Sequence, residues 1–363
     1  MDISVELRNV TKRFDDVIAV DTVSLKINRG EFFSLLGPSG CGKTTTLRLV
    51  AGFEEPTKGE ILINNQDVSN KRPYERNVNT VFQNYALFPH LTVAGNLRFG
   101  LERKKTPKAT ISGLVEEALD LVQMNKMGDR YPRQLSGGQQ QRIALARSLI
   151  LRPEVLLLDE PLGALDLKLR KAMQVELKNL QEKVGITFIY VTHDQEEALT
   201  MSDRIAVMEK GRLEQVGSPE EIYDLPKTRF VADFIGVSNF FSGKIVTITD
   251  DRMNFVSKGG LEVALPVNQN LSKGEEIQFS IRPEKIVINS ETDTANGENQ
   301  FTGEIVNRMY LGDSFHYIIA LSEKEKITVF LKQKETAQNQ VSFSKGDKVL
   351  VAWHKNSAVI LGE

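Results

Sequence analysis

The sequence predicts an α/β core with an inserted helical subdomain, followed by an all-β barrel of the OB type. Up to about residue 235, short apolar runs alternate with helical patterns, which is typical of a mainly parallel sheet. The segment from about 88 to 150 is helical and lacks a strong strand candidate. After about 238, short β-rich runs alternate with turn residues, as in a small antiparallel barrel. We therefore expect domains at 1–237 and 238–363.

Strands and one long helix define the predicted core. Residues 31–36 form an apolar run that leads into a glycine-rich turn, and residues 44–50 form the helix that follows. Residues 155–158 and 186–191 are apolar runs of strand length. Apolar residues at helical spacing predict an amphipathic helix between these two strands: Leu169, Met173, Leu177, Leu180 and Val184.

The inserted subdomain and the barrel are predicted from similar patterns. One helix of the subdomain has an apolar face made of Leu114, Val115, Ala118, Leu119 and Val122. The strand candidates of the barrel are 244–248, 277–281 and 348–353, and the polar stretch 289–299 predicts a surface loop.

Composition limits the classes of function. The 363 residues are 40% apolar and 26% charged, and the net charge of -2 argues against a broad nucleic-acid surface. The single cysteine, Cys41, excludes an internal disulfide framework and fits a reducing compartment. Residues 1–6 do not resemble a signal peptide, and no window approaches the ~18 apolar residues of a bilayer span. At a membrane, a partner would have to hold this chain.

The turn after the first core strand fits G-x-x-x-x-G-K-[ST] in a strand, turn and helix context, which predicts an ATP site of the P-loop NTPase type. Small residues let backbone amides surround phosphates, and the helix N-terminus adds a favourable dipole. Lys43 can reach the β- and γ-phosphates, and the Thr44 hydroxyl is expected to ligate Mg²⁺. Cys41 is interpreted as a small filler. The expected nucleotide contacts are Gly37, Pro38, Ser39, Gly40, Cys41, Gly42, Lys43, Thr44 and Thr45.

Asp159 and Glu160 follow an apolar strand, which places two carboxylates at the carboxyl edge of a parallel sheet. Alone, such a pair is often only a solvated strand end. Together with the phosphate loop, it predicts that Asp159 holds Mg²⁺ and that Glu160 polarises the attacking water, a contribution of about 10²- to 10⁴-fold in rate.

A second glycine motif, Leu135–Gln139, opens a helix 92 residues beyond Thr44. It offers backbone amides, a hydroxyl and a positive dipole end to an anion, although serine and glycine could merely cap the helix. With these motifs the chain resembles the ATPase subunit of an ATP-binding cassette transporter. The resemblance implies a homodimer in which the signature of one subunit caps the γ-phosphate held by the other. The implied contacts are Ser136, Gly137, Gly138 and Gln139.

The resemblance also assigns positions outside these motifs. Phe14 matches the aromatic that stacks on adenine, although a lone aromatic near a terminus is more often part of a core. Gln83 matches the glutamine that touches Mg²⁺ and the attacking water. Asp166 matches the loop that contacts the opposite subunit and could equally cap the following helix. His193, at the end of the next core strand, matches the histidine that senses the γ-phosphate. The expected activity is ATP hydrolysis.

Partners and cargo are expectations of the same resemblance. A single cassette without membrane segments is similar to importers, which implies two integral membrane permease subunits, an extracytoplasmic solute-binding protein and a position at the cytoplasmic face of the membrane. The apolar stretch Tyr85–His90 suggests a docking site for the permease, or it packs inside the helical subdomain. No nucleic acid is expected as a partner.

The cargo is predicted from the region after the cassette. Residues 280–286 resemble the accessory barrel (TOBE) of importers of polyamines, iron(III), sulfate, molybdate and some sugars. Residues 233–240 and 310–313 look most like the spermidine and putrescine group. A rival class is a cassette ATPase that acts on DNA or ribosomes. In the DNA-associated proteins the two motifs are separated by a long coiled coil, which the 92 residues here do not provide.

Overall fold

The computed structural model describes residues 2–291, 296–332 and 343–362. Contacts divide the chain into two compact units, Met1–Ile222 and Tyr223–Glu363. Within the described residues, no helix combines the length and the apolar character needed to cross a bilayer.

A six-stranded sheet forms the centre of the first unit, in the order β10-β9-β3-β8-β7-β6. All neighbours pair in parallel except β10 and β9, so the predicted mainly parallel α/β core is confirmed. The strands are β3 (Phe32–Leu36), β6 (Val78–Val81), β7 (Val155–Asp159), β8 (Thr187–Thr192), β9 (Arg204–Glu209) and β10 (Arg212–Gly217).

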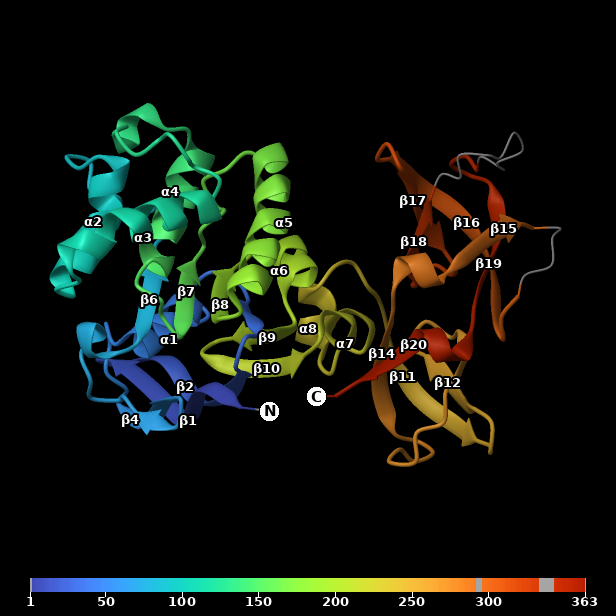
Figure 1. Cartoon of the computed structure of the whole chain (residues 1–363). Helices are drawn as coiled ribbons and strands as arrows, with labels where there is room; N and C mark the ends of the chain where they lie inside the picture. The colour runs from blue at the N-terminus through green and yellow to red at the C-terminus, as the bar shows by residue number, and fades with distance from the viewer. Residues whose placement is uncertain (1, 292–295, 333–342, 363) are drawn as a thin grey trace. The chain divides into compact units, whose positions relative to one another are not determined.

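The two faces of this sheet are covered by different elements (Figure 1). Successive strand residues point to opposite faces. Phe33 therefore packs with α1 (Lys43–Ala51), whereas Phe32 packs with α5 (Leu167–Val184) and α6 (Gln195–Met201). Both faces are apolar, which explains why the core strands are continuous apolar runs in the sequence.

A four-stranded antiparallel sheet, in the order β2-β1-β4-β5, shares the core that contains α1. This sheet was not predicted from the sequence. Its strands are β1 (Ile3–Phe14), β2 (Val17–Asn28), β4 (Lys58–Ile63) and β5 (Gln66–Asp67).

The inserted segment forms a cluster of helices, α2 (Val93–Arg103), α3 (Lys108–Leu121) and α4 (Gly137–Leu149), which pack on one another; α4 also packs against β6. This cluster has its own apolar core. The whole face predicted for one of its helices, from Leu114 to Val122, lies in that core.

The second unit contains two five-stranded antiparallel sheets around one apolar core, consistent with the predicted barrel. One sheet has β13 (Glu262–Leu265), β12 (Met253–Ser257), β11 (Asn239–Ile248), β14 (Glu276–Ile281) and β20 (Ala358–Leu361). The other has β15 (Val287–Ser290), β19 (Lys348–Trp353), β16 (Asn299–Tyr310), β17 (Ser314–Ala320) and β18 (Lys326–Lys332). All three predicted strands fall within β11, β14 and β19.

The loop predicted at 289–299 is only partly correct. Residues 289 and 290 end β15, and residues 292–295 lie outside the described residues. Asn299 begins β16 and is buried. Its side-chain amide accepts a hydrogen bond from Ala264 N (2.7 Å) and donates one to Ala264 O (3.0 Å), so its polar atoms are satisfied inside the protein. A polar residue of the predicted loop therefore serves as a cross-link inside the second unit.

The contact boundary at 222 precedes the expected domain end at 237 because residues 223–238 bind to the barrel. This segment includes the C-terminal part of α7 (Pro219–Asp224) and all of α8 (Arg229–Phe234). The buried Arg282 donates to Tyr223 O (3.1 and 2.8 Å), to Ala232 O (3.1 Å) and to Val237 O (3.2 Å). One guanidinium thus fixes the whole segment to the second unit.

Candidate ATP site

The phosphate loop lies between β3 and α1, as predicted. Two of its glycines cannot be replaced without a clash: a Cβ on Gly37 would lie 2.3 Å from Met208 O, and one on Gly42 would lie 2.3 Å from Ala19 O. Gly42 also has φ 102°, a conformation that favours glycine. Ser39 and Gly40 are exposed at the tip of the loop, Pro38 is half-buried, and Thr45 is half-buried in the first turn of α1. The loop is therefore shaped by close backbone contacts on both sides.

Lys43 is buried beneath this loop. Its ammonium donates to Gly37 O (2.7 Å) and Pro38 O (2.9 Å), and Cys41 Sγ lies at 3.8 Å. Burial raises the pKa of the Cys41 thiol, so the thiol stays protonated at neutral pH and is a poor nucleophile. The geometry agrees with the interpretation of Cys41 as a small filler.

Two side chains with oxygen atoms suited to a metal ion, Thr44 and Asp159, meet where α1 begins and β7 ends. Thr44 Oγ1 donates to Asp159 Oδ1 over 3.0 Å. Burial raises the pKa of Asp159, the hydrogen bond from Thr44 lowers it, and the charge of Glu160 raises it further. A hydroxyl and a carboxylate in contact are the ligand types that Mg²⁺ prefers when it also binds substrate phosphates. The donor set therefore fits Mg²⁺.

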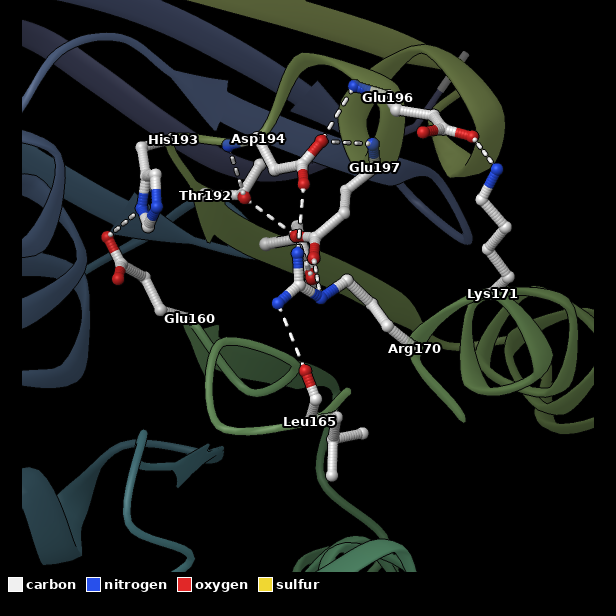
Figure 2. A network of polar contacts seen from close by, with 10 residues as sticks. Glu160, Leu165, Arg170, Lys171, Thr192, His193, Asp194, Glu196 and Glu197 are labelled. Carbon is white, nitrogen blue, oxygen red and sulfur yellow. Dashed lines mark hydrogen bonds and ion pairs between the residues drawn. The ribbon is translucent and has the colours of Figure 1, made fainter. Parts of the chain in front are cut away.

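Glu160 and His193 face one another from the ends of adjacent strands (Figure 2). His193 Nδ1 lies 3.2 Å from Glu160 Oε1, and Glu160 N donates to Val191 O (3.0 Å). Glu160 has φ 45°, a conformation that costs a non-glycine residue about 1–3 kcal/mol and is common at functional sites. The backbone strain at Glu160 thus accompanies a carboxylate that lies directly beside the histidine.

Gln83, after β6, reaches the same edge of the sheet. A Cβ built on Gly163 would lie 3.7 Å from Gln83 Nε2, so the amide of this exposed residue lies beside the loop that follows Glu160. Four segments of the chain, after β3, β6, β7 and β8, therefore contribute to one site.

The signature Leu135–Gln139 forms a capping box at the start of α4. Gln139 N donates to Ser136 Oγ (3.4 Å), and Ser136 N donates to Gln139 Oε1 (3.0 Å). Across the described parts of the chain, no hydrogen bond or ion pair joins Ser136–Gln139 to the phosphate loop. Gly137 and Gly138 occupy the first two helical positions. The capping role is present in the monomer, and a role toward a second subunit stays a prediction.

Asp166 and Phe14 lie at the edges of the predicted site. Asp166 caps α5 by accepting from Leu169 N (3.0 Å), one of its two predicted roles. Phe14 ends β1 and is 42% exposed, so it is not a core residue; Lys12 Nζ lies 4.7 Å from its ring centroid. An exposed ring can stack on a planar ligand.

The stretch Tyr85–His90 packs mainly on the helical subdomain. Tyr85 is buried, the tilted rings of Phe88 and Phe99 pack with centroids 4.6 Å apart, and Arg147 donates to Ala86 O (2.7 Å). Ala86, Pro89 and His90 remain exposed. The fully exposed part of the stretch is therefore limited to these three residues, while Leu87 and Phe88 are half-buried.

A network of polar side chains behind His193 was not predicted from the sequence. Arg170 contacts Leu165, Asp194 and Glu197, and Glu197 is 3% exposed (Figure 2). A signal was present in Asp194-x-x-Glu197, which predicts the start of a helix, and Asp194 does cap α6. Nothing in the sequence spacing pointed to Arg170.

Two family models match the chain. The ABC transporter model covers residues 20–163, and the TOBE domain model covers residues 279–361. The chain is similar to solved structures of the same fold. One is cbiO1 from Clostridium perfringens, part of the ABC transporter complex cbiONQ (TM-score 0.58, 30% identity, 61% of this chain and 91% of that chain). Another is a dimeric ATP-binding cassette in a post-hydrolysis state with ADP and Pi (TM-score 0.53, 34% identity, 59% and 98%).

Full-length relatives share about half of their residues with this chain. A spermidine/putrescine import ATP-binding protein PotA from Rubrobacter xylanophilus is 52% identical over 99% of this chain and 94% of its own length. Proteins of the same name from Thermobifida fusca and Pseudomonas aeruginosa are 50% and 49% identical, over 99% and 96% of this chain and 93% and 96% of their own lengths. Identity at this level over almost the whole length establishes the family, and the chain belongs to the ABC transporter family as an ATPase subunit.

Proposed function

We propose that this chain hydrolyses ATP to drive the import of spermidine and putrescine through a separate permease. The observation that carries the ATPase part is the site at the sheet edge, where Thr44 contacts Asp159 and Glu160 contacts His193. The cargo is inferred from relatives named as spermidine/putrescine import proteins that match nearly the whole chain, including the C-terminal unit.

In this proposal each residue of the site acts on one part of ATP. The amides of the phosphate loop surround the β- and γ-phosphates, and Lys43 leaves its loop carbonyls to neutralise their charge. Phe14 stacks on the adenine ring. Glu160 accepts the proton of the attacking water, and His193 contacts the γ-phosphate.

We further propose that Mg²⁺ binds together with ATP. Thr44, Asp159 and Gln83 would hold the ion, directly or through water. When bound, the ion neutralises charge on the phosphate oxygens. The contact between the Thr44 hydroxyl and the half-buried Asp159 carboxylate supports this assignment.

The active form in this proposal is a homodimer. Ser136, Gly137, Gly138 and Gln139 of one subunit cap the phosphate held by the other, with Asp166 at the same interface. The exposed start of α4 supports this role, because a helix N-terminus attracts anions. Two permease subunits at the membrane and an extracytoplasmic solute-binding protein complete the importer, with this chain on the cytoplasmic side.

Reconstitution with the native permease and solute-binding protein tests the proposal. Spermidine and putrescine should stimulate ATP hydrolysis, whereas iron(III), sulfate, molybdate and maltose should not. The control is the same complex without the binding protein, which should give only basal turnover. Stimulation by another ligand of this panel would reassign the cargo and keep the ATPase. Salt-sensitive binding to DNA or ribosomes without a permease would replace the proposal.

A further inference from the structure

Arg170, in the first turn of α5, contacts three separate segments (Figure 2). Its Nη2 donates to Leu165 O over 3.1 Å, and its Nη1 donates to Asp194 Oδ2 over 3.3 Å. Its Nε lies 3.9 Å from Glu197 Oε1, which makes an ion pair and not a hydrogen bond. One side chain therefore connects the loop after β7, the turn after β8 and helix α6.

Glu197 is the buried member of this network. One of its oxygens, Oε2, accepts hydrogen bonds from Tyr190 and Thr192, both at 2.6 Å, and the residue is 3% exposed. Burial raises the pKa of Glu197, while the two hydrogen bonds and the charge of Arg170 lower it. A buried carboxylate needs such partners, and Arg170 supplies the opposite charge.

The network holds the backbone on both sides of His193. Thr192 Oγ1 accepts from Asp194 N (2.9 Å), and Asp194 Oδ1 accepts from Glu196 N (2.9 Å). Both chain neighbours of His193 are therefore fixed from behind, while the imidazole of His193 points toward Glu160 (Figure 2). The position of the imidazole depends on residues that do not touch it.

We propose that Arg170 is a positioning residue that sets the loop Gly163–Asp166 and His193 in one fixed arrangement. The inference rests on the proposed role of His193 at the phosphate. A guanidinium carries donors in a rigid planar fork, so it can bind Leu165 O and Asp194 at once, whereas a lysine ammonium is a point charge on a flexible chain. Through Arg170, the position of this loop is thereby coupled to Asp194 and to the adjacent His193.

The first test compares the kinetics of R170K with those of a matched control. R170K keeps a positive charge beside Glu197, so we expect it to fold, whereas R170M would leave the buried Glu197 carboxylate without that charge. We expect R170K to lower kcat by about 10- to 100-fold, the loss typical of a small misplacement, with KM for ATP changed less than about twofold. The matched control is K171M. Lys171 is the next residue of α5, is 55% exposed, and forms a surface pair with Glu196 (2.9 Å) that contributes little.

A double-mutant cycle tests whether Arg170 acts through His193. If it does, R170K combined with H193A should lower kcat no further than H193A alone. Losses that multiply would assign Arg170 an independent, structural effect and overturn the inference. Unchanged kcat in R170K would overturn it as well.

An NMR measurement separates this inference from the proposed function. The chain has four histidines, so the imidazole signals can be assigned by substitution: His90, His193, His316 and His354. R170K should move the His193 signal and leave the other three, and K171M should move none. A wild-type protein that does not hydrolyse ATP would refute the proposed function, yet the His193 signal would still test the link. A signal that stays in place in R170K overturns the inference.

Discussion

Thr44 and Asp159, 115 residues apart, are joined by a hydrogen bond of 3.0 Å between the Thr44 hydroxyl and the Asp159 carboxylate. The bond connects the first turn of α1 to the last residue of β7. Burial nevertheless dominates the environment of Asp159 and raises its pKa above the ordinary value of 3.8. A carboxylate in such a place favours a cation nearby, at a cost in folding stability.

Replacing Asp159 with Asn should therefore stabilise the nucleotide-free protein at neutral pH. Because the folded pKa is raised, the folded state binds the proton more tightly than the unfolded state. The cost of ionisation is absent below pH 3.8, grows as pH rises through the folded pKa, and is complete above it. The free energy of unfolding, measured in urea at several pH values, should favour D159N near pH 7, with the gap closing toward pH 4.

The control for this measurement is D16N, because Asp16 is exposed. It should track the wild type at every pH. A D159N protein that is less stable throughout would mean that the Thr44 hydrogen bond outweighs the burial of the charge. Turnover should fall in D159N at all Mg²⁺ concentrations, which separates the stability effect from function.

Glu160→Gln should abolish turnover, because an amide cannot take the proton of the attacking water. We expect a loss of about 10²- to 10⁴-fold, together with an ATP-bound dimer that persists in size-exclusion chromatography. Glu196→Gln is the matched control, since Glu196 is an exposed acid in a surface ion pair. Normal hydrolysis by E160Q would remove Glu160 from its role.

Ser136 combines a capping role with a predicted phosphate contact, and two substitutions separate them. Asn is as good an N-cap as Ser but lacks the hydroxyl, so S136N should keep the thermal stability and ATP binding of the monomer while hydrolysis falls. S136A also loses the cap, which costs about 0.5–2 kcal/mol. The measurements are thermal unfolding, nucleotide binding and turnover.

Two outcomes for S136N would contradict this prediction. Normal hydrolysis would reduce Ser136 to a cap. Equal losses of monomer ATP binding and hydrolysis would place Ser136 at the nucleotide of its own subunit and remove the composite site.

The central sheet could be predicted because its strands are buried on both faces and appear as unbroken apolar runs. The sheet formed by β1 and β2 could not, because its pairing is irregular. The register shifts between Leu7 and Val10, and Asn9 adopts φ 48°, so the alternation of apolar and polar residues is lost. Where the period-two pattern breaks, the sequence carries no strand signal.

Most of the predicted site residues belong to contiguous motifs, and the others, Phe14, Gln83, Asp166 and His193, were assigned by the family resemblance. Gly37–Thr44 and Leu135–Gln139 could be predicted directly, because the phosphate contacts proposed for them depend on local backbone shape. The contacts of Arg170 with Asp194 and Glu197 join separate elements, and their spacing follows no local rule. Such networks become visible only in three dimensions.

The position at which the chain is cut should decide how soluble the isolated ATPase unit is. The sequence suggested an end near 237, but Val231, Ala232 and Ile235 are fully buried and belong to the second unit, where Arg282 donates to Ala232 O. A chain that ends at 237 would expose these residues, whereas one that ends at Asp224 keeps α7 whole and omits them.

We expect both truncated chains to retain basal ATP turnover per folded molecule, because all of the proposed site lies before residue 194. The chain ending at 237 should aggregate more readily in light scattering, since it carries apolar residues without their partners. Equal solubility of the two chains would show that residues 225–237 find other contacts. A folded but inactive chain ending at Asp224 would show that the second unit takes part in hydrolysis.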